Sequence, residues 1–377
     1  MKTTARPWRK ALHATLAVAI GVAAVGCSKE EKGIDSEAAG DCAYPPDSVV
    51  EIHIPGSVGG GSDTTARTLA PHLSRLTPGH PNIQIKNYPD ALQVTAANQF
   101  LRTPDDGSNI LALSRSSTYP VVLGLEGVEY GFDNLTPIVG FQTGALTYSR
   151  SDLGIKDGEG LAKYGGELIY GASSPVGGNT PTLLSFELLG LDPKTVFGYD
   201  GSGPVRVAFE QGEVNINYDT SASVLEYVDG QIEKGAATPL FTFGVMENGK
   251  WARDPMMPDY PTLEEVYTKA FGKEPSGVEW DAFNALTVPG LTLNKSLWLH
   301  KSAPEWAKCA LGKGVEALMN DEEFNKNRGE EIGPYALYRG KELQDLVERV
   351  FNIPEESLDW LRTWLHDKYD ADFKDFE

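Results

Sequence analysis

From residue 49 onward the chain alternates short apolar stretches with longer stretches of helical periodicity, and this alternation restricts its fold more than any other feature. Residues 49–54 (VVEIHI) have a period of two, with Val50, Ile52 and Ile54 on one face, which predicts a strand. A glycine-rich turn follows, and apolar residues then recur at helical spacing between residues 66 and 76. Repeated strand–helix units of this kind predict an α/β fold with largely parallel sheets.

The same rhythm continues toward the C-terminus. We expect further strands at 82–86, 110–113, 168–170, 195–199, 214–218 and 240–243, and helices at 93–101, 182–189, 204–211, 304–319, 341–351 and 354–368. The long apolar stretch 136–148 separates two such series of units. It therefore predicts a crossover between two lobes.

Residues 1–27 form a segment of their own. Four basic side chains and no acidic one precede an apolar run over about residues 12–26, and small residues stand directly before Cys27. This order describes a secretory signal peptide, because the run is shorter than the roughly 20 residues of a spanning helix. Small residues before a cysteine also resemble the lipobox of bacterial lipoproteins, so we expect signal peptide 1–26 to be removed and Cys27 to be acylated. The alternative is a plain signal peptide cut near Gly26.

The remaining two cysteines are an even number in an oxidising compartment, once Cys27 carries lipid. A Cys42–Cys309 disulfide would join the start of the fold to a late helix, and two unpaired thiols are the alternative. The absence of a Cys-x-x-Cys pair excludes a zinc ribbon and a thioredoxin-like motif. Residues 27–47 are polar, and we expect them to form a flexible tether.

The charge balance excludes one class of partner. The chain has 53 acidic and 33 basic side chains, a net charge of −20, and such a surface repels the phosphates of nucleic acid. Its 377 residues exceed one typical domain, and a hydrophobic fraction of 41% is enough for a substantial core. We therefore expect a soluble acidic globular protein that does not bind nucleic acid.

The most informative segment is the turn at residues 56–63 (GSVGGGSD), between a predicted strand and a predicted helix. Glycines let backbone N–H groups converge on an anion there, and the helix N-terminus adds favourable partial charge. The turn is not a Walker A loop, because Ser62 and Asp63 follow Gly61, and Thr64 replaces the third glycine of a dinucleotide fingerprint. The alternative is a tight turn that Ser62 or Asp63 caps.

Two further polar turns follow predicted strands, at residues 173–180 (SSPVGGNT) and 114–118 (SRSST). All three turns lie at carboxyl ends of strands, where open α/β sheets bind their ligands. Together they predict a cleft lined by amides and hydroxyls that suits a small anion. Arg115 could point into this cleft and pair with a carboxylate, or outward as a surface charge, and we favour the outward position.

Catalytic motifs are missing by comparison. Residues 171–175 (GASSP) lack the final glycine of a nucleophile elbow, and the six histidines show no metal-ligand spacing. We therefore expect no catalytic residue, no metal site and no cofactor. The alternative, an α/β enzyme that uses Ser173 or Ser62, lacks a base at a suitable spacing.

The first loop and the helix after it contain residues 54–56 (IPG), 59–63 (GGGSD) and 66–67 (AR). These residues resemble the first loop of the solute receptors for tripartite tricarboxylate transporters. Later segments resemble motifs of this family in the same order: 104–107 (PDDG), 135–138 (LTPI), 199–204 (YDGSGP), 211–214 (QGEV) and 260–265 (YPTLEE). The resemblance extends over residues 49–319. Three departures are Pro181, where the family usually has a histidine, the unusual charge of Arg115, and a longer C-terminal extension past Met319.

The resemblance implies a type II periplasmic binding protein, in which two α/β lobes joined by crossover strands close on a ligand in the cleft between them. We expect lobe 1 to comprise 48–140 and 281–377, and lobe 2 to comprise 141–280. Family members hold their ligand through loops of both lobes. Matched position by position, the implied ligand-binding residues are Gly59, Gly60, Gly61, Ser62, Asp63, Ser116, Ser117, Thr118, Ser173, Val176, Gly177, Gly178, Asn179 and Thr180, with Asp219 in support.

The resemblance also implies a function. The chain would be an extracytoplasmic, lipid-anchored and monomeric receptor rather than an enzyme. It would capture a small organic mono- or dicarboxylate and deliver it to a two-component integral membrane transporter. The alternative is a binding protein for another anion in a different uptake or sensing system.

Overall fold

The computed structural model describes residues 42–89, 93–247 and 250–374, all of which belong to one structural unit. The predicted signal peptide, the acylation of Cys27 and the tether up to residue 41 lie outside the described residues. None of the helices in the described ranges combines the length and apolar character that crossing a membrane requires.

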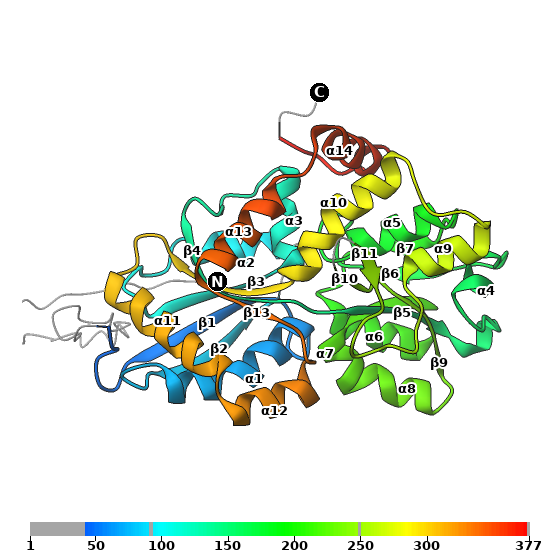
Figure 1. Cartoon of the computed structure of the whole chain (residues 1–377). Helices are drawn as coiled ribbons and strands as arrows, with labels where there is room; N and C mark the ends of the chain where they lie inside the picture. Colours follow the sequence, from blue (N-terminus) through cyan, green and yellow to red (C-terminus); the bar gives the residue numbers. More distant parts are fainter. Residues whose placement is uncertain (1–41, 90–92, 248–249, 375–377) are drawn as a thin grey trace, which may run out of the picture. The chain divides into compact units, whose positions relative to one another are not determined.

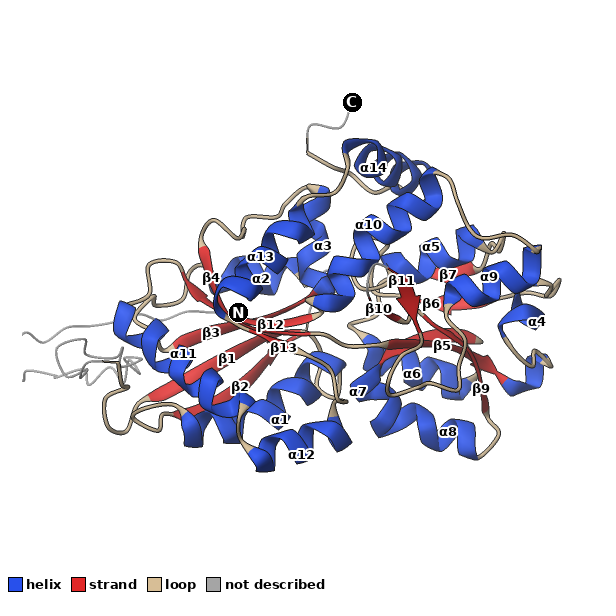
Figure 2. Cartoon of the chain, in the orientation of Figure 1, coloured by secondary structure: helices blue, strands red, loops and turns tan. Residues whose placement is uncertain are grey.

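The first sheet has six strands in the order β13-β4-β12-β3-β1-β2 (Figure 2). β1 pairs in parallel with β2 and β3, whereas β12 runs antiparallel to both β3 and β4. A strand from late in the chain therefore lies in the middle of the sheet. The bounds are β1 Val49–Pro55, β2 Asn82–Tyr88, β3 Asn109–Ser114, β4 Leu135–Phe141, β12 Lys295–His300 and β13 Leu337–Tyr338.

The second sheet has five strands in the order β7-β6-β8-β5-β9. β6 pairs in parallel with β7 and β8, and β5 runs antiparallel to β8 and β9, so the pattern of the first sheet recurs. β10 (Val245–Glu247) and β11 (Lys250–Ala252) form a separate antiparallel pair. The bounds are β5 Ala145–Arg150, β6 Ile169–Gly171, β7 Lys194–Val196, β8 Ile216–Thr220 and β9 Ala237–Thr242.

Helices cover both faces of the first sheet, with α1, α11 and α12 on one side and α2, α3 and α13 on the other (Figure 1). Their bounds are α1 Gly61–Leu76, α2 Val94–Phe100, α3 Arg115–Leu123, α11 Glu305–Met319, α12 Glu322–Glu331 and α13 Gly340–Phe351. The other α-helices are α4 Gly158–Ala162, α5 Thr180–Leu188, α6 Ser202–Gln211, α7 Ser221–Ser223, α8 Asp229–Glu233, α9 Leu263–Phe271, α10 Val278–Thr292 and α14 Glu355–Tyr369. A 3-10 turn at Ser151–Leu153 and a π turn at Val224–Val228 complete the set in the described ranges.

Burial on both faces explains why the strands are nearly continuous apolar runs. In β3, Ile110 and Ala112 belong to the core cluster that includes α1 and α11, whereas Leu111 and Leu113 face the cluster that includes α2. Successive side chains of a strand point to opposite faces, so a strand covered on both sides needs apolar residues throughout. The predicted α/β class is confirmed by this arrangement. The expectation of largely parallel sheets is wrong, because four strand pairs of the two large sheets are parallel and five are antiparallel.

Two connections join the sheets. One leads from β4 directly into β5, within the apolar stretch 136–148, and the other leads from α10 back into β12. They lie against each other, because the backbone N–H of Thr143 donates to the carbonyl of Leu291 and the Asn294 amide donates to the Thr143 hydroxyl. The predicted crossover is therefore one of two chain segments that connect the sheets side by side.

A disulfide joins Cys42 to Cys309, which confirms the predicted pairing. Cys309 lies on α11, so the bond attaches the start of the described chain to a helix that covers the first sheet.

The C-terminal helix α14 packs on α10, and its side chains reach two further helices. Trp364 and Lys368 both donate to the carboxylate of Glu187 on α5, and Arg362 donates to the carbonyl of Leu123 on α3. The C-terminal extension thereby connects helices that follow strands of different sheets.

Most predicted elements are present with ends shifted by a few residues. Several elements of the structure were not expected, among them α4, α9, α10, α12 and β12. Residues 114–118 are not a polar turn, because β3 ends at Ser114 and α3 begins at Arg115. The side chain of Ser114 caps this helix by accepting from the backbone N–H of Ser116.

Candidate functional site

A cavity of about 70 Å³ lies where the loops of the two sheets meet. Most of its wall consists of hydroxyl groups, amides and glycine backbone, with few apolar side chains. Elements of the first sheet contribute Pro55, Gly56, Ser57, Gly60, Gly61, Ser62, Gln93, Ser114, Ser116 and Lys295. Elements of the second sheet contribute Gly171, Ser173, Asn179, Gly201, Ser202, Val205, Asn217, Tyr218, Asp219 and Thr220.

Four helices begin at this wall. The lining residues include the first residues of α1 and α6, the caps of α3 and α5, and the second residue of α3. The first N–H groups of a helix have no partner inside the helix and carry partial positive charge. Four such ends around one cavity favour a bound anion.

Two glycines allow the opposing loops to approach. A Cβ atom on Gly61 would collide with the hydroxyl of Thr220, and one on Gly178 would collide with the hydroxyl of Ser116. Each of these contacts joins an element of the first sheet to an element of the second. Glycine is therefore required at both positions for the loops to meet.

Lys295 places an ammonium group at the cavity. It is the first residue of β12, it is 8% exposed, and its Nζ donates to the Ser62 hydroxyl over 3.1 Å. Burial and, to a smaller extent, the nearby charge of Arg115 together lower the pKa of Lys295 to about 7.

Arg115 lies beneath the cavity wall and not on the surface. The preference for an outward Arg115 is wrong, because the side chain is only 1% exposed. Its guanidinium lies 5.1 Å from the ring centre of Tyr218 and 5.8 Å from that of Phe243, both in the second sheet's half of the molecule. Neither Nη1 nor Nη2 has a hydrogen-bond partner.

A third cation, Arg206, is fully engaged by protein groups. Its Nη1 donates to Asp219 over 2.8 Å, and its Nη2 donates to the carbonyl of Gly59 over 2.7 Å. Its guanidinium stacks over Tyr227 at 4.2 Å, and Asp219 also accepts from the Tyr148 hydroxyl. Burial raises the pKa of Asp219, an effect that Arg206 opposes. Arg206 thus neutralises Asp219 and holds the first loop.

The structure brings about half of the predicted site residues to the cavity. These are Gly60, Gly61, Ser62, Ser116, Ser173, Asn179 and Asp219. The first loop and the third segment therefore contribute, and the second loop contributes through its two ends.

The other predicted residues do not line the cavity but support its walls. Gly59 and Asp63 line a neighbouring hollow, where the Gly59 N–H donates to the Asp63 carboxylate. Ser117 donates to the side chain of Gln93, and Thr118 donates to the carbonyl of Ser114. Within the second loop the hydroxyl of Thr180 accepts from the Gly177 N–H, while Val176 is buried and Gly178 packs against Ser116.

Sequence reasoning missed Lys295, the basic residue among those that line the cavity. Lys295 follows Asn294 in a segment without glycine, motif or clear period, and all of β12 is buried. A lysine directly before a run centred on Leu297, Trp298 and Leu299 is the one local signal that could have singled it out.

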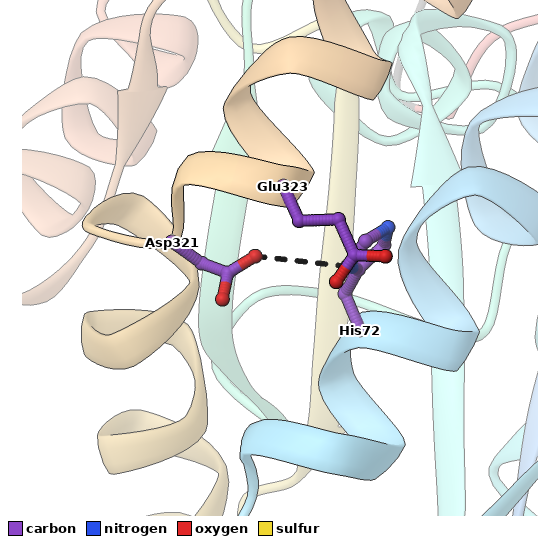
Figure 3. A group of neighbouring side chains, drawn as sticks. All are labelled: His72, Asp321 and Glu323. Atoms are coloured by element: carbon purple, nitrogen blue, oxygen red, sulfur yellow. Dashed lines mark ion pairs between the residues drawn. The ribbon is translucent and has the colours of Figure 1, made fainter.

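A group of side chains away from the cavity has metal-ligating chemistry. His72 on α1 lies beside Asp321 and Glu323 at the start of α12, with 3.8 Å between His72 Nδ1 and Asp321 (Figure 3). Arg75 already pairs with both carboxylates, and Asp321 caps α12 by accepting from the Phe324 N–H. These contacts attach α12 to α1 and already engage both carboxylates, so we infer no metal site there.

Solved structures share this fold. MatC from Rhodopseudomonas palustris with bound malate is 19% identical, with a TM-score of 0.61 over 84% of this chain and 99% of that chain. Rpa4515 of R. palustris with adipate is 20% identical, with a TM-score of 0.65 over 84% and 98%. A TctC solute-binding protein from Polaromonas, without ligand, is 14% identical, with a TM-score of 0.51 over 85% and 99%.

The chain therefore has the fold of periplasmic binding proteins, which confirms the predicted fold class. The periplasmic binding protein BugD, which is 18% identical with a TM-score of 0.64 over 85% of this chain and 98% of that chain, shares the same fold. No protein-family model and no curated protein matches the chain.

Proposed function

We propose that this chain is an extracytoplasmic receptor that captures a small organic carboxylate and delivers it to a two-component membrane transporter of the tripartite tricarboxylate type. The observation that carries the proposal is the cavity wall, where four helix N-termini and the Lys295 ammonium converge. Such a wall stabilises negative charge without a metal or cofactor. The neighbours that hold malate and adipate support an organic acid as the ligand.

Ligand capture would proceed by closure of two lobes, 48–140 with 281–377 and 141–280. The contacts across the cleft support this mechanism: Arg206 holds the carbonyl of Gly59, and Thr64 donates to Glu226 over 3.0 Å. These two contacts are polar, so they can form and break with the ligand. The paired connections at Thr143 and Asn294 are the natural hinge.

Delivery from outside the cytoplasm is supported by the predicted signal peptide 1–26 and by the lipid expected on Cys27. The Cys42–Cys309 disulfide suits an oxidising compartment. We further propose that the receptor is a monomer and that it is not an enzyme. The Lys295 ammonium contacts the Ser62 hydroxyl over 3.1 Å, and the neighbouring binding proteins support a role of this pair in holding a ligand and not in catalysis.

The ligand class can be tested by thermal shift and calorimetry on the purified protein. We expect organic carboxylates of three to six carbons to raise the melting temperature, while phosphate and sulfate leave it unchanged. Stabilisation by inorganic anions alone would overturn the carboxylate proposal in favour of another anion receptor.

The transporter partner needs a separate test. We expect uptake of the identified carboxylate by cells to require this chain together with one large and one small multi-span membrane protein encoded beside it. Dependence on an ATPase-driven transporter instead would contradict the assignment.

A further inference from the structure

Two buried cations at the cavity lack an anionic partner. Lys295 donates to the neutral Ser62 hydroxyl, and the terminal nitrogens of Arg115 have no acceptor. Across the described ranges, neither side chain forms an ion pair with a carboxylate. Buried charges in proteins are ordinarily paired, so this arrangement is incomplete without a further negative group.

The two cations occupy adjacent positions in the first sheet. Lys295 pairs in register with Ser114, and Arg115 directly follows Ser114 in the chain. The charge of Arg115 is close enough to act on Lys295, because it contributes to lowering the Lys295 pKa. Both charges therefore act on one end of the cavity.

Nothing else at the cavity compensates them. Asp219 is the acidic side chain of the wall, and Arg206 already pairs with it over 2.8 Å. The tyrosine ring of Tyr218 and the phenylalanine ring of Phe243 face Arg115 with their π-systems, which attract a cation more weakly than a carboxylate does. Both basic groups thus remain available to the ligand.

We propose that Lys295 and Arg115 determine specificity by selecting a dicarboxylate over a monocarboxylate of the same length. This inference rests on the proposed function. One carboxylate is held by the helix N-termini, which supply partial charges only. The second carboxylate lies at the Lys295 end of the cavity, where it pairs with the ammonium and is stabilised by the field of the Arg115 guanidinium.

Matched ligand pairs separate this inference from the function it rests on. Malonate, succinate, glutarate and adipate are titrated against propionate, butyrate, valerate and hexanoate by isothermal calorimetry. We expect the wild-type protein to prefer at least one dicarboxylate to its partner by 100-fold or more. If neither series binds, the proposed function is overturned. If the monocarboxylates bind as tightly as the dicarboxylates or more tightly, only the inference is overturned.

The residues are tested with variants of Lys295. Lys295→Met should lose 50-fold or more in dicarboxylate affinity and less than 3-fold in monocarboxylate affinity, and Lys295→Arg should keep most of the preference. The control is Lys313→Met, since Lys313 is an exposed lysine on α11. An equal loss for both ligand series, or no loss, contradicts the role of Lys295.

A variant of Arg115 tests the dicarboxylate preference independently of Lys295. Arg115→Met keeps an unbranched side chain of similar length between the rings of Tyr218 and Phe243. We expect the dicarboxylate preference to shrink about 10-fold while the monocarboxylate affinity is retained. If Arg115→Met does not fold, Lys295→Met and Lys295→Arg still decide the inference.

Discussion

The two sheets share a strand order but differ in the charge they bring to the cavity. In the first sheet β12 runs antiparallel beside β3, and in the second β5 runs antiparallel beside β8. In both pairs the first residue of the antiparallel strand faces the last residue of its neighbour. In the first sheet these residues are Lys295 and Ser114, and in the second they are Ala145 and Thr220. The residue that follows β3 is Arg115, and the residue that follows β8 is Ser221.

Equivalent backbone positions thus carry two cations in one half and two small neutral residues in the other. The second half has its own buried charges, Arg206 and Asp219, but they neutralise each other. One half is therefore electrostatically complete without a ligand, whereas the other is not. Removing a cation should have opposite consequences for stability in the two halves.

The largest effect is expected in the half that is complete. Arg206→Met leaves Asp219 buried without its partner and frees the carbonyl of Gly59, so we expect a loss of about 3–5 kcal/mol in the free energy of unfolding. Chemical denaturation measures this loss. Arg102→Met, in an exposed ion pair with Glu129, is the control and should cost at most about 1 kcal/mol.

Adding Asp219→Asn to Arg206→Met should recover part of the loss, because it removes the uncompensated carboxylate. A double variant as unstable as the single one would show that Arg206 acts through packing on Tyr227 and not through charge.

A second large effect should come from the contact between the halves. Gly178→Val introduces side-chain atoms where Ser116 and Tyr218 lie, so the loops cannot meet. We expect carboxylate affinity to fall by roughly 100-fold, or about 3 kcal/mol, with little change in melting temperature. Calorimetry checks the affinity. Gly165→Val, where a side chain meets open space, should bind as wild type, and unchanged affinity in Gly178→Val would refute the loop contact.

In the half that lacks a counter-ion, loss of a cation should stabilise the empty protein. The pKa of Lys295 is about 7 when folded and 10.5 in its ordinary state, so the unfolded chain binds more protons between these values. The wild type therefore gains stability as the pH rises from 7 toward 10. Lys295→Met removes the cost of burying the ammonium and should raise the melting temperature by roughly 2–6 °C at pH 6.

The gain should shrink at pH 9, where much of the wild-type Lys295 is already neutral. Scanning calorimetry at both pH values provides the comparison. A destabilised Lys295→Met at pH 6 would mean that the ammonium has a partner or a packing role in the empty protein.

The sequence predicted the half of the site that depends on local signals. The turn at 56–63 combines glycines with the start of an amphipathic helix, and both features are legible within a few residues. Gly60, Gly61 and Ser62 accordingly line the cavity. The disulfide was likewise predictable from the number of cysteines, because only two remain after Cys27 is set aside.

The cations were not predictable in the same way. The environment of Arg115 is set by Tyr218 and Phe243, which lie more than 100 positions later in the chain. The role of Lys295 depends on β12 returning to the middle of the first sheet, a topological fact without a local motif. The sequence predicted a turn at 114–118 and no element at 295–300. Both predictions failed because the residues that these segments contact are distant in the chain.

The smallest effect, and the one that links charge to function, is the pH dependence of binding. In the empty cavity Lys295 is about half protonated near pH 7, whereas a bound second carboxylate favours the ammonium and raises its pKa. Dicarboxylate affinity should therefore be full below pH 7 and fall roughly tenfold between pH 6 and pH 8.

The other titratable groups around the two cations do not produce this profile. Burial raises the pKa values of Tyr119 and Tyr170, which move further from neutrality, and Asp219 keeps Arg206 as its partner. Monocarboxylate affinity should accordingly stay flat from pH 6 to pH 8, as should dicarboxylate affinity in Lys295→Met. Calorimetric titrations at pH 6, 7 and 8 compare dicarboxylate binding by the wild type, monocarboxylate binding by the wild type and dicarboxylate binding by Lys295→Met. A wild-type profile as flat as that of the variant would mean that Lys295 keeps one protonation state throughout and that the charge difference between the two halves does not reach the ligand.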